Sequence, residues 1–221
     1  MENTPLEAES LEELARKIRA WTPKGLRPTE LQALRSLTYT QNFTKILPRV
    51  FPCKLTIGDN PPDFILLAES EKIAIEATSL TTPQFEVFKR ERLEGGPHTS
   101  TLASGRADKD FWQKMREYKL PDDSRVKPAT TLVSDALQNN FTIASQVIAA
   151  KIEDLRRYHA NYSSRILLVS DELSCDAFFL EPLAKALRQW LLTFTAEIIF
   201  NQIIIVCRAH GPNGCASACL R

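Results

Sequence analysis

Residues 62–80 read PDFILLAESEKIAIEATSL, and this stretch decides the fold. Two runs of strand-forming residues, 63–69 and 72–80, flank the polar pair Ser70-Glu71. Because so short a polar break leaves room only for a tight turn, we expect the two runs to form an antiparallel hairpin. The first run is apolar at successive positions, which is typical of a strand that is covered on both faces.

The segments outside the hairpin show helical or strand-like periodicity. After the hairpin, helices and strands alternate, which is typical of parallel strands with helical connections. The sequence therefore predicts an α/β fold, in which a mixed sheet (an antiparallel hairpin plus parallel strands) is flanked by helices on both faces. In chain order we expect a helix from Leu11, a helix from a Thr29–Gln32 capping box to about Leu47, strands over 51–57, 63–69 and 72–80, a helix over 141–158, a strand over 165–170, a helix over 181–194 and a strand over 202–207.

Composition narrows the class of protein. Of the 221 residues, 43% are hydrophobic and 25% are charged, which excludes collagen-like, coiled-coil and wholly disordered chains. The apolar runs are too short to span a bilayer, so no membrane partner is expected. The first twenty residues hold five glutamates and do not resemble a secretory signal, which predicts a cytoplasmic location. A net charge of +1 gives no global field, so any contact with nucleic acid must depend on local charges.

The sequence divides into three parts. We expect a helix and linker over 1–28, a single domain over 29–210, and a flexible tail over 211–221. The domain carries a partly structured insertion at about 81–140, because sixty residues is too long for a bare loop. Its opposite charges nearly balance, which favours a solvated surface over a nucleic-acid contact. The cysteines and histidine near the tail match no common zinc-site spacing.

Two carboxylates are expected to meet in the hairpin. A turn at Ser70-Glu71 brings Asp63 beside residues 76–78 of the next strand. There, Glu76 shares one face with Ala74 and Thr78, so a carboxylate interrupts an apolar strand. Burying an unpaired carboxylate is costly, and we therefore expect a side-chain cation or a metal ion nearby.

The helix over 141–158 supplies a candidate cation. Helical periodicity puts Lys151 in the middle of the apolar stripe that contains Val147 and Leu155. The lysine stem can pack along the helix while its amino group reaches solvent at the helix edge. The amino group can equally point at the carboxylates on the sheet. The periodicity does not choose between these two orientations.

The arrangement resembles the PD-(D/E)XK nuclease superfamily. Pro62-Asp63 on one strand and Glu76-Ala77-Thr78 on the next match its motif in order, spacing and strand context. The resemblance implies a restriction endonuclease-like core of helix, three antiparallel strands, helix and strand over residues 29–170. It is closest to a divergent branch whose motif ends in Glu-x-Thr and in which the following helix supplies the lysine, the position of Lys151. Thr78 stands at the usual lysine position, and Lys72 is a second, less favoured replacement.

The resemblance implies metal-dependent hydrolysis of phosphodiester bonds, with DNA as the expected nucleic-acid partner. Asp63, Glu76 and the main-chain carbonyl near Ala77 would hold Mg²⁺ (or Mn²⁺), which prefers oxygen ligands. Lys151 would orient the attacking water or stabilise charge in the transition state. Glu30 would be either an additional acid or a glutamate that interacts with the dipole of its helix.

Two other functions stay open beside the enzyme. Because Thr78 is no cation, the chain can be a catalytically inactive nuclease-like domain that acts as a binding or protein-interaction module. It can also be a structural domain in which Glu76 and Lys151 form a buried ion pair. Whether the chain forms a homodimer is left open as well.

Overall fold

The structure is a computed structural model. It describes residues 4–40, 43–48, 50–58, 61–69, 71–80, 129–156, 161–171, 180–208 and 215–221. The chain divides into two units, of which the first comprises residues 1–80 and 137–221 and the second residues 81–136. Nearly all of the second unit, including most of the insertion expected at about 81–140, lies outside the described residues. The fold described below is that of the first unit.

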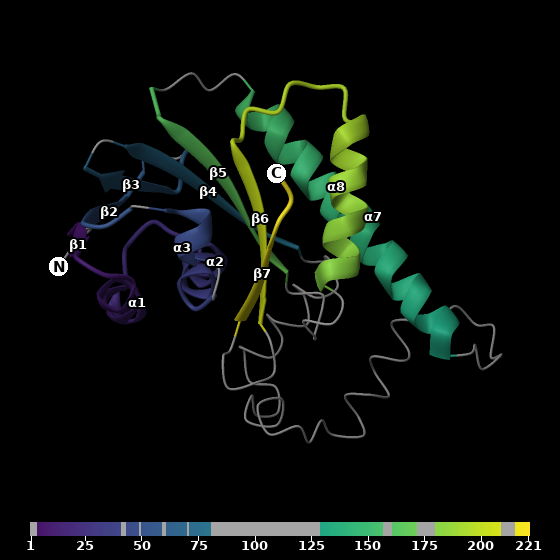
Figure 1. Cartoon of the computed structure of the whole chain (residues 1–221), viewed down its shortest axis with the longest axis horizontal. Coiled ribbons are helices and arrows are strands. Elements are labelled where there is room, and N and C mark those ends of the chain that lie inside the picture. Colours follow the sequence, from purple (N-terminus) through teal and green to yellow (C-terminus); the bar gives the residue numbers. More distant parts are fainter. Residues whose placement is uncertain are drawn as a thin grey trace. The chain divides into compact units, whose positions relative to one another are not determined.

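A seven-stranded mixed sheet forms the centre of the first unit (Figure 1). The strands follow one another across the sheet in chain order. The pairs β4–β5 and β5–β6 are parallel, and all other neighbours are antiparallel. The chain is thus an α/β protein with a mixed sheet, as the sequence predicts. The strands are β1 (Leu6–Ala8), β2 (Cys53–Ile57), β3 (Phe64–Ala68), β4 (Lys72–Leu80), β5 (Ser164–Asp171), β6 (Gln202–Arg208) and β7 (Cys215–Cys219).

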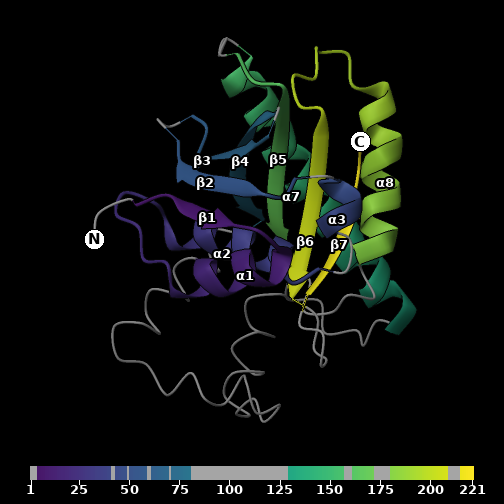
Figure 2. The same cartoon turned by 60° about the vertical axis from the view of Figure 1, so that its left-hand side comes forward.

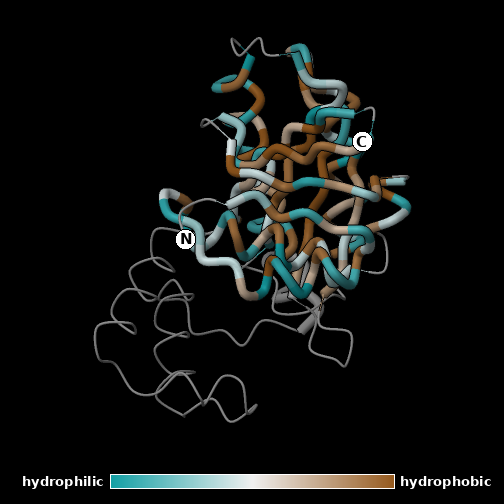
Figure 3. Tube along the Cα trace, turned by 90° about the vertical axis from the view of Figure 1, so that its left-hand side faces the viewer, coloured by the Kyte–Doolittle hydropathy of each residue, from teal (hydrophilic) through white to brown (hydrophobic). Residues whose placement is uncertain are grey.

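Helices cover both faces of the sheet (Figures 1 and 2). One face packs against α1 (Leu11–Ala20), α2 (Pro28–Thr38) and α3 (Phe43–Ile46). The other face packs against α7 (Ala129–Leu155) and α8 (Leu180–Thr193). In Figure 3 the hydrophobic (brown) stretches of the trace gather in the middle of the unit, and the hydrophilic (teal) ones lie mostly at its periphery.

Alternation along the strands separates the two cores. Ile73, Ile75 and Ala77 of β4 pack in the core of α1, α2 and α3. On β5, Leu167 and Val169 belong to the opposite core, beneath α7 and α8. Because successive strand residues face opposite sides, this parity turns Glu76 toward α7. The face assigned to Glu76 from the sequence is therefore confirmed.

The two edge strands of the sheet are not predicted from the sequence. Residues 215–219, expected in a flexible tail, instead form β7 and pair with residues 204–208 of β6. This pairing satisfies backbone groups that a loose tail would expose to water, and Leu220 beyond it is buried. At the other edge, β1 pairs with β2 and so joins the N-terminal segment to the sheet.

The second expected helix differs in its bounds. It ends at Thr38, and α3 forms separately, because Thr38 and Thr40 donate their hydroxyls to the carbonyls of Arg35 and Leu37. Such side-chain bonds compete with continuation of a helix. Its capping box is formed by Arg27 and Glu30, with Pro28 in the first turn, and not by Thr29 and Gln32.

The strand β3 is covered less completely than its composition suggests. Phe64 and Leu66 are buried, whereas Ile65 and Leu67 on its other face are only partly buried. In the described part of the chain, no helix has both the length and the apolar character needed to cross a membrane.

Candidate functional site

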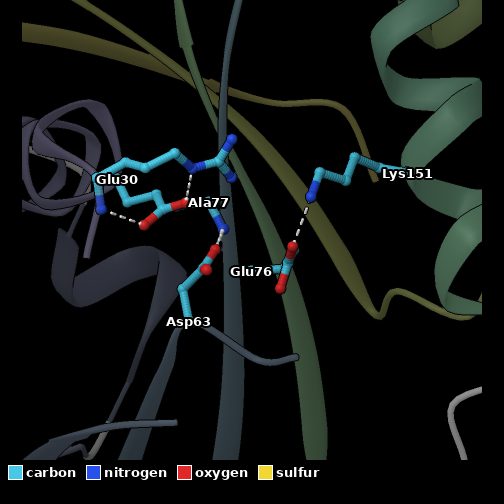
Figure 4. Close-up of polar contacts among 6 residues, drawn as sticks. Glu30, Asp63, Glu76, Ala77 and Lys151 are labelled. Carbon is cyan, nitrogen blue, oxygen red and sulfur yellow. Dashed lines mark hydrogen bonds and ion pairs between the residues drawn. The ribbon is translucent and has the colours of Figure 1, made fainter. Parts of the chain in front are cut away.

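Asp63 lies where β3 begins. The ladder with β4 runs as far as the pair Phe64–Ile75, so the next residue in register with Asp63 is Glu76. Beyond that pair the Asp63 side chain continues the hydrogen bonding, because its Oδ2 accepts the backbone N–H of Ala77 at 2.7 Å (Figure 4). The residue is buried, with 4% of its surface exposed. The expected position of Asp63 beside residues 76–78 is therefore confirmed.

Lys151 reaches the sheet from α7. Its Nζ donates to Oε1 of Glu76 at 2.6 Å (Figure 4). The Glu76 side chain is 5% exposed and that of Lys151 is 22% exposed, so the acid is buried and the lysine is partly accessible to solvent. Of the two orientations that the sequence leaves open for Lys151, the structure has the one directed at the carboxylates.

The second oxygen of Glu76 has no such partner. Oε2 is buried and accepts no hydrogen bond from any residue that the structure describes. A buried carboxylate oxygen without a donor is costly, and this cost is removed when a cation or a water molecule lies beside it. Glu76 therefore has an acceptor available for a ligand that none of the described residues supplies.

A third carboxylate approaches from α2. Glu30 is buried, and its two oxygens accept the backbone N–H of Arg27 at 2.8 Å and Nε of the same arginine at 2.5 Å. Glu30 thus has the capping role, and its charge also acts on Asp63. Its position in the first turn of α2 agrees with the glutamate expected to interact with the helix dipole, and a role as an additional acid of the site stays a prediction.

Crowding of these carboxylates changes the protonation of Asp63. Burial, and after it the negative charge of Glu76, raise the pKa of Asp63 to about 7. The hydrogen bond from Ala77 opposes this rise, because it stabilises the ionised form; Glu30 adds to the rise and Lys151 reduces it. Asp63 consequently exchanges its proton near neutral pH, where a bound cation would compete with that proton.

A small pocket adjoins Glu76 on the α7 side of the sheet. It encloses about 20 Å³, which is room for about one water molecule. Its walls are mostly apolar, and the polar side chains of Glu76, Tyr162 and Arg165 also belong to the lining. The pocket is lined by Pro61, Pro62, Ala74, Glu76, Leu155, Tyr162, Arg165, Ile166, Ile199 and Phe200.

The donor set suits a hard divalent cation that keeps water ligands. Within the described ranges, no group of three or more His, Cys, Asp or Glu side chains is arranged to hold a metal ion. Two carboxylates, Asp63 and Glu76, meet at the β3–β4 junction, and the free Oε2 of Glu76 fits a cation there. Mg²⁺ is commonly held by one or two carboxylates plus waters, so the shortage of protein ligands does not conflict with this ion.

The two other positions considered for the cation do not join the carboxylates. Lys72 turns to Tyr162, with Nζ at 4.9 Å from the ring centroid. Thr78 remains a half-buried neutral residue on β4. Among these three positions, only Lys151 contacts a carboxylate of the site.

One residue of the cluster is not predicted from the sequence. Glu30 lies in the first turn after Pro28, as the acid of a capping box does, but Arg27 is not one of the Ser, Thr, Asp or Asn residues that usually mark an N-cap. Its proximity to Asp63 and Glu76 depends on the packing of α2 against the sheet and has no signal in the local sequence.

Comparison with protein-family models, curated proteins and solved structures finds no match for this chain.

Proposed function

We propose that the chain is a metal-dependent nuclease with a restriction endonuclease-like fold, and that it hydrolyses phosphodiester bonds of DNA. One observation carries the proposal: the ammonium group of Lys151 contacts Glu76 at 2.6 Å, while Asp63 is held at the adjoining position of the same hairpin. Two neighbouring carboxylates, with a lysine bound to one of them, are groups that metal-assisted phosphodiester hydrolysis can use.

The order of the elements supports the fold. The succession of α2, strands β2 to β4, α7 and β5 agrees with the core of helix, three antiparallel strands, helix and strand that the sequence resemblance implies. The carboxylates come from the strand junction and the lysine from the following helix, as in the divergent branch with Glu-x-Thr.

The charges of the cluster support a divalent cation. Three carboxylates, of Glu30, Asp63 and Glu76, face two cations, Arg27 and Lys151. With Asp63 ionised, the cluster has an excess of one negative charge. A divalent cation would reverse this to one positive charge, and a single phosphodiester would then neutralise it.

The residues would divide the work as follows. Asp63, Glu76 and the main-chain carbonyl near Ala77 would hold Mg²⁺ or Mn²⁺, which when bound polarises a phosphoryl oxygen and acidifies a coordinated water. Lys151 has three ammonium hydrogens and gives one to Glu76. The remaining donors are available to orient the attacking water and to stabilise the charge that develops on the phosphorus oxygens.

The alternative is a catalytically inactive nuclease-like domain that acts as a binding or protein-interaction module, and a third possibility is a structural domain in which Glu76 and Lys151 form a buried ion pair. The raised pKa of Asp63 favours these functions without metal, because a proton on Asp63 balances the charges of the cluster. The alternatives differ in one measurable respect, since only the enzyme needs an ionised Asp63 and a bound cation.

A cleavage assay tests the proposal. Purified protein is mixed with supercoiled plasmid in Mg²⁺, Mn²⁺ or EDTA, beside Asp63→Asn, Glu76→Gln and the surface control Asp154→Asn on α7. We expect metal-dependent cleavage by the wild type and by Asp154→Asn, and a loss of about 100-fold or more in the two site variants. The proposal is overturned if the wild type cleaves the plasmid with neither Mg²⁺ nor Mn²⁺. It is also overturned if wild type and Glu76→Gln cleave equally well.

A further inference from the structure

Arg27 occupies a position where helix stability alone does not favour an arginine. It is the N-cap residue of α2, a position usually taken by Ser, Thr, Asp or Asn. The positive end of the helix dipole opposes a cation at this end. The residue is nevertheless held there by a buried acid, Glu30, through both its backbone and its side chain.

The hold of Glu30 leaves part of the guanidinium available. Glu30 binds only Nε of the side chain, and the two terminal nitrogens of Arg27 form no hydrogen bond with any described residue. The Arg27 side chain is 69% exposed, whereas that of Glu30 is 5% exposed. The buried carboxylate of Glu30 thus fixes Nε of Arg27, and the two terminal nitrogens form an exposed planar fork.

The fork lies in the field of the proposed metal ligands. The hydrogen bond from Arg27 to Glu30 raises the pKa of the arginine, and the charges of Asp63 and Glu76 raise it further. In Figure 4, Glu30 approaches these two carboxylates from the side opposite to Lys151. The carboxylate pair is therefore flanked by one cation from α2 and another from α7.

We propose that Arg27 contacts a phosphate of the nucleic-acid substrate at the edge of the site. The inference rests on the proposed function and adds a substrate-binding residue that the PD-Glu-x-Thr motif does not include. An arginine with two free parallel donors matches the oxygens of a phosphate, and it is preferred to lysine where a planar, two-point contact is needed. Arg27 has this geometry without giving up its bond to Glu30.

The test compares Arg27→Met with a matched surface arginine. Arg16 is 74% exposed and pairs with Glu13 three residues away, as Arg27 pairs with Glu30, but it lies on α1. Cleavage of a fluorescein-labelled DNA duplex is measured with Mn²⁺ at several salt concentrations. For Arg27→Met we expect kcat/KM to fall about 10- to 100-fold. We also expect the dependence of log KM on log salt to become shallower by about one. Arg16→Met should match the wild type.

Two further variants separate phosphate contact from neutralisation of Glu30. Arg27→Lys keeps the charge and loses the fork, so its activity should lie between those of wild type and Arg27→Met. The double variant Arg27→Met/Glu30→Gln removes both charges and should remain as defective as Arg27→Met. Thermal melts of all variants confirm that each is folded at the assay temperature.

The outcomes are distinct. If the wild type cleaves DNA and Arg27→Met does so equally well with an unchanged salt dependence, this proposal is overturned and the nuclease assignment stands. Recovery of activity in the double variant also overturns it, because Arg27 would then act only on Glu30. If the wild type neither cleaves DNA nor responds to metal, the proposed function fails and this proposal fails with it.

Discussion

Lys151 Nζ and Glu76 Oε1 lie 2.6 Å apart although 75 positions separate the two residues in the chain. The contact joins α7 to β4 across one core of the sheet. Glu76 is almost fully buried and Lys151 is not, so the two partners do not contribute equally. Removal of the lysine leaves a buried charge uncompensated, whereas removal of the acid leaves an amine that can still reach water.

Lys151→Met should therefore lower both stability and activity. We expect a loss of about 1–3 kcal/mol in the free energy of unfolding, because Glu76 would keep its charge without a partner. Urea denaturation at pH 7.5 measures the first effect and plasmid cleavage the second. The double variant Lys151→Met/Glu76→Gln should regain most of the stability and none of the activity. A stable, fully active Lys151→Met would contradict the role given to this lysine.

Lys72→Met, in contrast, should leave the activity nearly unchanged. Because Lys72 lies over the Tyr162 ring and not at the carboxylates, its removal should leave the cleavage rate within about twofold of wild type. Cleavage by the two lysine variants, measured side by side, identifies the cation that serves the site. If Lys72→Met lost as much activity as Lys151→Met, the assignment of the role to Lys151 alone would be wrong.

Asp63 should make stability depend on pH in metal-free buffer. Its pKa is about 7 in the folded chain and 3.8 ordinarily, so the folded state binds the proton more tightly between these values. The stabilisation associated with the bound proton is complete below about pH 4 and is lost as the pH rises through 7. Asp63→Asn lacks this titration and should be more stable than the wild type by about 1–3 kcal/mol at pH 8.

Denaturation of both proteins in EDTA at pH 4.5, 6, 7 and 8 measures this difference. The advantage of Asp63→Asn should grow with pH and level off above 7. An advantage that stays constant across the series would mean that Asp63 does not titrate in this range.

Divalent cations should stabilise the wild type selectively. A cation that binds only the folded state at a hundred times its dissociation constant adds about 2.7 kcal/mol. We expect Mg²⁺ or Mn²⁺ to raise the melting temperature, and to do so more at pH 8 than at pH 6, since the proton on Asp63 competes with the cation. The control Asp154→Asn should respond like the wild type. If Asp63→Asn and Glu76→Gln were stabilised by the cation as much as the wild type, the cation would bind at another place.

Much of this fold is predictable because its signals are local. The brief polar break at residues 70 and 71 sets the hairpin register, and that register brings Asp63 to Glu76 and Ala77. Parity along β4 then determines which helices Glu76 faces. These inferences need only a turn length and the alternation of a strand.

The remaining features depend on partners distant in sequence. The strand β7 consists of small residues without a strand-like pattern. It becomes a strand because its backbone pairs with the edge of β6. Helical periodicity gives the angular position of Lys151 but not the direction of its flexible side chain, which Glu76 determines. Arg27 joins the cluster through the packing of α2, which no local pattern encodes.

The separation of Glu76 and Lys151 along the chain has a consequence for how the site is assembled. A polypeptide ending at Leu80 would carry Arg27 and all three acids, and one beginning at Ala129 would carry only the lysine. The parallel pairing of β4 with β5 is the seam at which two such pieces would meet. Neither piece alone would hold both partners of the Glu76–Lys151 ion pair, so the site exists only where this parallel pairing brings the two parts of the chain together.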